Sequence, residues 1–71
     1  MKLQEFIAEL GGPTMASKRL KTTRSAISQW NIGAALPSTR MMMKIVKVSN
    51  GRCSYKEMIE PYFREKAKRE L

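Results

Sequence analysis

Polar residues able to recognise nucleic-acid bases cluster in one short stretch of this sequence. They form two adjacent pairs four residues apart, Arg24-Ser25 and Ser28-Gln29, so that in a helix they would share one face. The guanidinium of Arg24 can donate two hydrogen bonds to the O6 and N7 atoms of guanine, and the amide of Gln29 can pair with the N6 and N7 atoms of adenine. The serine hydroxyls are short enough to let such a helix sit close to bases or phosphates. The set predicts base recognition in the major groove of DNA.

The charge distribution indicates an anionic partner. The chain has 14 basic and 6 acidic residues and a formal net charge of +8 at pH 7, and no acidic residue lies between Glu9 and Glu57. The basic residues of that interval are Lys18, Arg19, Lys21, Arg24, Arg40, Lys44, Lys47, Arg52 and Lys56. A cationic surface without opposing carboxylates attracts a polyanion and displaces its counterions. Charge alone leaves three partners open, namely a nucleic acid, an anionic membrane surface and an acidic protein.

The composition argues against catalysis. The chain has no histidine and a single cysteine, so the usual transition-metal ligand sets and histidine-based catalytic triads cannot be assembled. With 71 residues it can form one small domain, whose core leaves little room to enclose a small-molecule substrate. We therefore expect a protein that is not an enzyme, needs no metal or other cofactor, and works through an exposed face.

Cys53 and the hydropathy pattern bear on location. A lone cysteine cannot form an intrachain disulfide, which fits a reducing cytosol, and we expect Cys53 to be a small buried apolar residue rather than a reactive thiol. No apolar run approaches the roughly 18 to 20 residues that cross a bilayer, and Glu5 comes too early for a signal peptide. We expect a cytoplasmic protein without a membrane partner.

The base-recognition residues need a helix to carry them and a second helix to brace it. Pro13 favours the first position of a helix, and the pattern predicts a short helix over residues 13–20. Its inward-facing residues are expected to be Met15, Ala16 and Leu20. Thr23 is the predicted N-cap of the next helix, residues 24–31, and Gly33 fits the stop signal that follows it. The buried side of that helix should hold Ala26, Ile27 and Trp30, and the spacing favours Trp30 as a core anchor over a stacking platform for bases.

Further helices are predicted on both sides of this pair. Apolar residues at helical spacing predict a helix over residues 2–10, which Gly11 and Gly12 end. Pro37 and Ser38 open a helix with apolar residues at spacings of three and four, and its triple methionine, residues 41–43, must leave at least one side chain exposed. Residues 45–55 admit two interpretations. Asn50-Gly51 can join two strands in a hairpin, but it can also end a helix, and we prefer the helix.

The C-terminal part is predicted to be a short helix followed by a tail. Ser54 and Glu57 have the spacing of a capping box, which starts a helix to about residue 59, and Glu60-Pro61 then breaks or restarts it. Residues 64–71 are charged and lack an apolar stripe, so we expect a frayed helix or mobile tail. The sequence thus predicts an all-α, five-helix domain over residues 1–63 with a charged tail over residues 64–71. An α+β fold with a hairpin over residues 45–55 is the alternative.

A dimer is expected because one recognition helix has limited selectivity. A bidentate base contact provides roughly 1 to 3 kcal/mol of discrimination, so a single helix specifies only a few base pairs. A two-fold dimer with two such helices about 34 Å apart would read both half-sites of a pseudo-palindrome. The candidate dimer interface is an apolar set that exceeds the needs of a small core: Tyr55, Met58, Tyr62 and Phe63. The alternative is that these residues close the core of the domain itself.

The sequence resembles the phage Cro-type repressors and their relatives, the YdaS-type prophage regulators. The resemblance is carried by residues 17–30, Gly33, Pro37, Arg40 and residues 54–63. It implies a lambda-repressor-like helix-turn-helix domain at a phage lysis-lysogeny switch, with base contacts from Arg24, Ser25, Ser28 and Gln29 and phosphate contacts near Thr14 and at Thr23. The cations expected to contact phosphates beside them are Lys18, Lys21, Arg40 and Lys44. Two positions depart from the family pattern, since Lys21 replaces the usual glycine of the turn and Ser17 a small alanine.

These observations predict a transcriptional repressor that binds a pseudo-palindromic double-stranded DNA operator as a homodimer. Such a protein would act in the cytoplasm of a bacterial host, in association with the nucleoid, by excluding RNA polymerase from a promoter. Two alternatives remain. One is an antitoxin-like or excision-directing prophage regulator, which also binds DNA, and the other is a basic module that binds a protein or a membrane surface.

Overall fold

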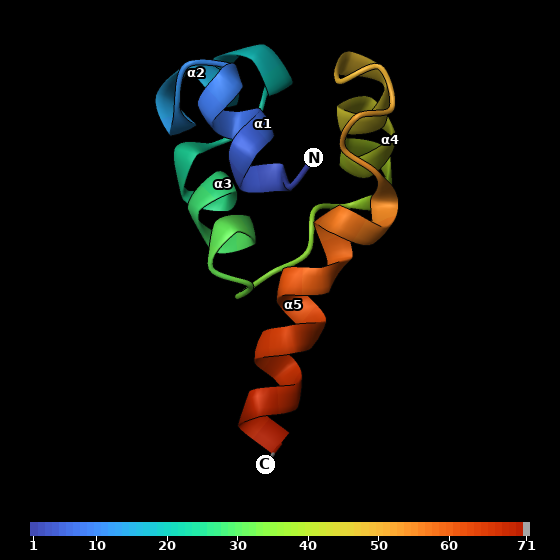
Figure 1. The fold of residues 1–71 in the computed structure, drawn as a ribbon. Helices are drawn as coiled ribbons and strands as arrows, with labels where there is room; N and C mark the ends of the chain where they lie inside the picture. Colours follow the sequence, from blue (N-terminus) through green and yellow to red (C-terminus); the bar gives the residue numbers. More distant parts are fainter. Residues whose placement is uncertain (71) are drawn as a thin grey trace.

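The computed structural model describes residues 1–70 and confirms the all-helical prediction (Figure 1). Its helices are α1 (Leu3–Glu9), α2 (Pro13–Leu20), α3 (Arg24–Asn31), α4 (Thr39–Val48) and α5 (Tyr55–Glu70). No strand is present within residues 1–70. Helices α1 to α3 form one side of the molecule, α4 lies on the other, and α5 extends away from the body of the domain. Of the helices described, none is long and apolar enough to cross a membrane.

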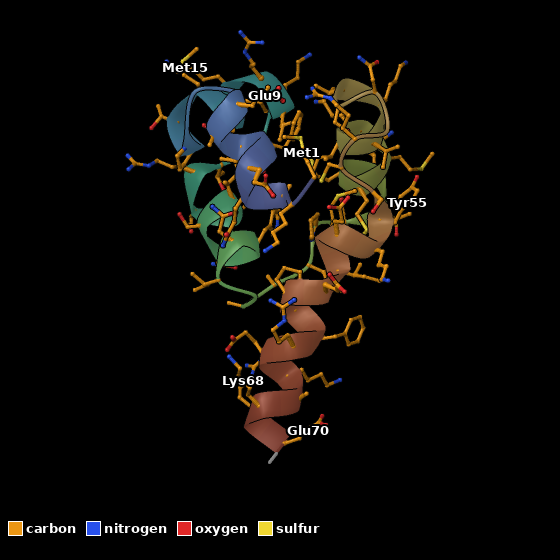
Figure 2. The ribbon with its side chains drawn as sticks, viewed as in Figure 1. Met1, Glu9, Met15, Tyr55, Lys68 and Glu70 are labelled. Atoms are coloured by element: carbon orange, nitrogen blue, oxygen red, sulfur yellow. The ribbon has the colours of Figure 1, made fainter. Side chains whose placement is uncertain are left out.

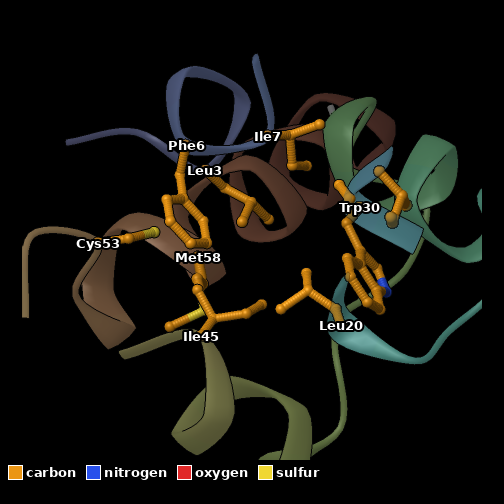
Figure 3. Packing of buried hydrophobic residues seen from close by; sticks show 10 residues of the cluster. Leu3, Phe6, Ile7, Leu20, Trp30, Ile45, Cys53 and Met58 are labelled. Atoms are coloured by element: carbon orange, nitrogen blue, oxygen red, sulfur yellow. The ribbon is translucent and has the colours of Figure 1, made fainter. Parts of the chain in front are cut away.

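One hydrophobic core joins the five helices (Figure 3). Its buried residues are Leu3, Phe6 and Ile7 of α1, Ala16 and Leu20 of α2, Ile27 and Trp30 of α3, Ile45 of α4, Met58 of α5, and Cys53 from the segment before α5. Trp30 is 6% exposed, which confirms it as a core anchor. Helices as short as α2 and α3 are marginal in isolation, so the shared core holds them and sets how α3 presents its outer face.

The α2–α3 pair has the predicted bounds. The Oγ1 atom of Thr23 accepts a hydrogen bond from the Ala26 N–H at 3.0 Å, so Thr23 caps α3 as predicted. Lys21, between the helices, has a φ of 55°, a left-handed conformation that strains a residue with a side chain.

The expectation that Met15 faces inward was wrong, since its side chain is 42% exposed. Only the side of α2 that carries Ala16 and Leu20 faces the core, and the next residue along a helix points about 100° away.

Residues 45–55 form the end of α4, a turn and the start of α5, so the hairpin alternative is wrong. Asn50 and Gly51 have φ values of 56° and 78°, and the Gly51 N–H donates to the Val46 carbonyl at 2.8 Å. Left-handed residues with such a bond end a helix. The buried Ser49 secures the turn, because its Oγ donates to the Val46 carbonyl and accepts from the Cys53 N–H. Local hydrogen bonds therefore favour the helix over a strand pair.

Helix α5 continues through Pro61 to Glu70, so the predicted break was wrong. A proline inside a helix leaves one carbonyl without its partner, at a cost of about 3 kcal/mol or more. Packing offsets this cost, since Met58 is buried in the core and the Gly33 backbone lies against the Pro61 carbonyl. The predicted capping box is present, with the Glu57 N–H donating to Ser54 Oγ at 3.3 Å and the Ser54 N–H donating to Glu57 Oε1 at 3.2 Å.

The segment expected to be a tail is a helical extension of the domain. Residues 64–70 belong to α5, and Lys68 and Glu70 lie on the part that extends past the other helices (Figure 2). Lys68 Nζ lies 3.4 Å from Glu65 Oε1, three residues earlier on the helix. Leu71, the last residue of the predicted tail, lies outside the described residues.

Cys53 is fully buried, as expected for an apolar role. Burial raises the pKa of its thiol, and a buried neutral thiol is a poor nucleophile. At pH 8 we expect a thiol-specific reagent to modify Cys53 about 100-fold more slowly in the native protein than in the protein unfolded by urea. In the native protein the reagent can reach the thiol only when the core opens. Spectrophotometric measurement of both rates checks this, and equal rates would show that the thiol is accessible.

Candidate nucleic-acid interface

The residues predicted to contact bases lie together on the outer face of α3, and all are exposed: Arg24, Ser25, Ser28 and Gln29. Ile27 and Trp30 fix the opposite side of the helix in the core. The ion pairs formed within residues 1–70 join the Met1 amino group to Glu57, Arg52 to Glu9 and Lys68 to Glu65. The guanidinium of Arg24 is therefore free of a carboxylate in the described part of the chain and available to an external acceptor.

Most of the residues predicted to contact phosphates are exposed. Those on α2, in the turn and at the start of α4 are all exposed: Thr14, Lys18, Lys21, Thr23 and Arg40. Thr14 and Arg40 lie in the first turns of α2 and α4, and Thr23 is the N-cap of α3. A helix N-terminus carries unpaired N–H groups and a partial positive charge. These positions are therefore suited to binding phosphate oxygens.

Lys44, also predicted to contact phosphate, is engaged inside the domain. Its Nζ donates to the carbonyl oxygen of Leu20 at 2.8 Å in a part-buried position. The amine thus joins α4 to the end of α2, next to the turn that leads into α3. A structural role for this lysine was not predicted from the sequence, since its charge matched the surface pattern and nothing in its spacing indicated a partner on α2.

Most of the predicted cationic surface has no ion-pair partner among residues 1–70. The exposed members without one are Lys18, Arg19, Lys21, Arg24, Arg40, Lys47 and Lys56. Arg52 is an exception, with Nη1 2.8 Å from Oε1 of Glu9. The hydrogen bond with Arg52 lowers the pKa of the Glu9 carboxyl. The expectation that this surface faces no carboxylate was therefore wrong at Arg52, because folding brings the end of α1 beside it.

The predicted dimer residues divide between surface and core. Tyr55 and Phe63 are 48% and 52% exposed, and Tyr55 points outward from the start of α5 (Figure 2). Tyr62 is half-buried, with its ring centroid 5.3 Å from that of Phe63 in an edge-to-face arrangement. Met58 is 2% exposed and belongs to the domain core, so its assignment to a dimer interface was wrong. Helical spacing places the half-buried Ile59 between Tyr55 and Phe63 instead.

Two contacts at the end of α3 hold this helix against its neighbours, and sequence reasoning missed their role. The Nε2 atom of Gln4 in α1 donates to the carbonyl of Asn31 at 2.9 Å. A Cβ atom added to Gly33 would lie 2.5 Å from the carbonyl oxygen of Pro61, so the backbone at the end of α3 is in direct contact with α5. Gly33 was predicted only as a helix stop. A glycine placed where a helix should end does not indicate which distant residue packs against it.

A surface cavity of about 440 Å³ lies beside these contacts, between the first turn of α1, the last turn of α3 and α5. Its walls combine apolar groups, such as Leu3 and Pro61, with charges of both signs, such as Lys2 and Glu60. Within residues 1–70 no group of three or more His, Cys, Asp or Glu side chains is placed to hold a metal ion. The cavity adjoins Trp30 and Asn31, whereas Arg24 lies in the first turn of the same helix.

Comparison with known proteins finds no relative for this chain. No family model, curated protein or solved structure matches it. The function therefore has to be inferred from the residues of the chain and their arrangement.

Proposed function

We propose that the protein is a sequence-specific DNA-binding transcriptional repressor of the phage Cro type. In this proposal α2 and α3 act as a helix-turn-helix unit, and α3 enters the major groove of an operator. The single observation that carries the proposal is the outer face of α3, where Arg24 and Gln29 are exposed and free of competing carboxylates while the opposite side is fixed in the core. Two side chains with bidentate hydrogen-bonding groups on one rigid helix are what reading of base edges requires.

The surrounding charge supports binding to the duplex backbone. Exposed cations at the end of α2 and in the turn precede the N-terminus of α3, and Arg40 lies in the first turn of α4. Contacts of this kind position a protein on DNA without reading the sequence. They also displace counterions from the duplex, so binding should weaken steeply as salt increases.

A homodimer is part of the proposal because the α3 face alone reads too few base pairs. The exposed rings of Tyr55 and Phe63 and the half-buried Tyr62 and Ile59 offer an apolar stripe on α5 for a second copy. Pairing through this stripe would present two α3 helices to two half-sites. The protein would then act at a bacterial promoter, in the cytoplasm and on the nucleoid, by occupying the site that RNA polymerase needs.

Selection of bound duplexes from a random pool tests this function. The purified chain is incubated with duplexes that carry about 20 random base pairs, enough for two half-sites one helical turn apart, and the bound duplexes are sequenced. We expect a two-fold symmetric consensus, and a promoter carrying it should be transcribed less in the presence of the protein. An antitoxin-like or excision-directing regulator would also give a consensus but leave such a promoter unaffected.

The remaining outcome distinguishes the protein-binding or membrane-surface alternative. If the chain binds all duplexes equally, the outer face of α3 reads no bases and the proposed function is wrong. Binding to anionic vesicles or to an acidic protein, with no preference among duplexes, would then identify the cationic surface as a general anion-binding face.

A further inference from the structure

The amine of Lys44 donates a hydrogen bond to the carbonyl of Leu20, the last residue of α2. Its Nζ lies 2.8 Å from the Leu20 oxygen in a part-buried position, and Leu20 itself is fully buried. The last carbonyls of a helix have no partner within that helix. The N–H groups of Lys21 and Thr22, which follow, both donate to the carbonyl of Ser17. Lys44 therefore supplies the Leu20 carbonyl with a donor from outside the α2–α3 pair.

The turn after Leu20 is short and strained. Lys21 has φ 55° and ψ 51°, a left-handed conformation that residues with a side chain rarely adopt. Only Lys21 and Thr22 separate Leu20 from Thr23, the N-cap of α3. The position of the Leu20 carbonyl consequently limits where α3 can begin. A positive charge at the end of α2 is also favoured by the helix dipole.

We propose that Lys44 is a positioning residue for α3 rather than a phosphate contact. By holding the Leu20 carbonyl, its ammonium group fixes the turn and hence the placement of Arg24 and the rest of the outer face. Gln4 makes the corresponding contact at the far end of α3, on the Asn31 carbonyl. Each helix of the pair is thus held at its C-terminal end by a side chain from another helix. Only the DNA-binding part of this inference rests on the proposed function.

The first measurement needs no DNA. Lys44→Met keeps the apolar stem and removes the donor, Lys44→Arg keeps a charged donor, and Lys47→Met is the matched control because Lys47 is exposed on the same helix. We expect amide hydrogen exchange at Thr22, followed by NMR, to accelerate about tenfold in Lys44→Met and to stay unchanged in Lys47→Met. Lys44→Arg should restore most of the protection. If Lys44→Met does not fold, Lys44→Leu, which also lacks a donor, replaces it in the same comparison.

Unchanged exchange at Thr22 in the donor-free variant would overturn the proposal, whether or not the chain binds DNA. So would equal acceleration in Lys47→Met, which would show a general effect of losing a lysine from α4. Acceleration in Lys44→Met alone, with Lys44→Arg and Lys47→Met protected, supports the proposal that the Lys44 ammonium holds the turn.

The second measurement separates positioning from phosphate contact. A lysine that neutralises one phosphate contributes about 0.9 to the slope of log K against log salt concentration. We expect Lys44→Met to leave this slope unchanged and to reduce the preference for the selected operator over an unrelated duplex about tenfold. A slope reduced by about 0.9 with the preference intact would make Lys44 a phosphate contact and overturn the proposal. If the wild-type chain prefers no duplex, the proposed function fails, while the exchange data still decide the role of Lys44.

Discussion

Substitution of Gly33 by alanine is expected to remove about 4 kcal/mol from the free energy of unfolding. The added Cβ would lie 2.5 Å from the Pro61 carbonyl oxygen and 2.7 Å from Cγ of Glu65. That oxygen belongs to the backbone of α5 and cannot rotate away, so α3 and α5 would have to separate. The φ of 77° at Gly33 adds roughly 1 kcal/mol of strain for a residue with a side chain. Urea unfolding followed by the fluorescence of Trp30 measures the change.

The expected loss is large against the stability of so small a domain. A chain of 71 residues has about 4 to 10 kcal/mol of total stability, so the variant would keep only about 0 to 6 kcal/mol and would unfold at a much lower urea concentration. Because Gly33 follows the helix proposed to read bases, operator binding should be lost at the same urea concentration as the fold. Recovery of binding at low temperature would accompany recovery of structure.

Gly51→Ala is the matched control for this prediction. Gly51 has nearly the same φ, 78°, but no described atom lies within 4 Å of the Cβ that alanine would add. Only the conformational strain of roughly 1 kcal/mol is therefore expected. The difference between the two variants isolates the contact between the end of α3 and α5. Equal losses in both would contradict that contact as the source of the effect.

The parts of the fold that the sequence predicted correctly are those determined by local interactions. Thr23 caps α3 through a hydrogen bond to a residue three positions away, and the spacing of Ile27 and Trp30 defines the side that is buried. Given that side, the exposure of Arg24 follows from helix geometry alone. The candidate base-reading face could for this reason be placed before the structure was known, although its function stays a prediction.

The errors concern contacts between residues far apart in the chain. Pro61 breaks an isolated helix, but here the core and the backbone of Gly33 hold α5 on both sides of it. The pairing of Arg52 with Glu9 spans 43 positions, and no periodicity encodes such a pair. Met58 lies on the same helix as Tyr55, and only the packing of α5 on the rest of the domain decides which of them is buried. Tertiary packing, not local preference, determines these features.

Under the proposed function, Arg24→Ala should relax the preference for guanine at one position of each operator half-site. A bidentate arginine contact provides about 1 to 3 kcal/mol of discrimination against a wrong base pair. A symmetric dimer makes this contact twice, so the variant should lose about 2 to 6 kcal/mol of discrimination between operators. Arg24 is exposed, and its guanidinium takes part in none of the ion pairs of residues 1–70. Its removal should consequently leave the free energy of unfolding nearly unchanged. Binding of the variant to the selected operator and to operators altered at each position measures the loss.

Lys47→Ala separates base reading from general attraction to the duplex. Lys47 is exposed on α4 and carries the same charge as Arg24, but it lies outside the polar face of α3. Loss of a phosphate contact weakens binding to all duplexes about equally and lowers the salt slope by about 1 for each contact, whereas loss of a base contact changes the ranking of sequences. If Arg24→Ala behaves like Lys47→Ala, with uniform weakening and an unchanged ranking, then α3 does not read bases. The cationic surface would in that case hold DNA without selecting a site.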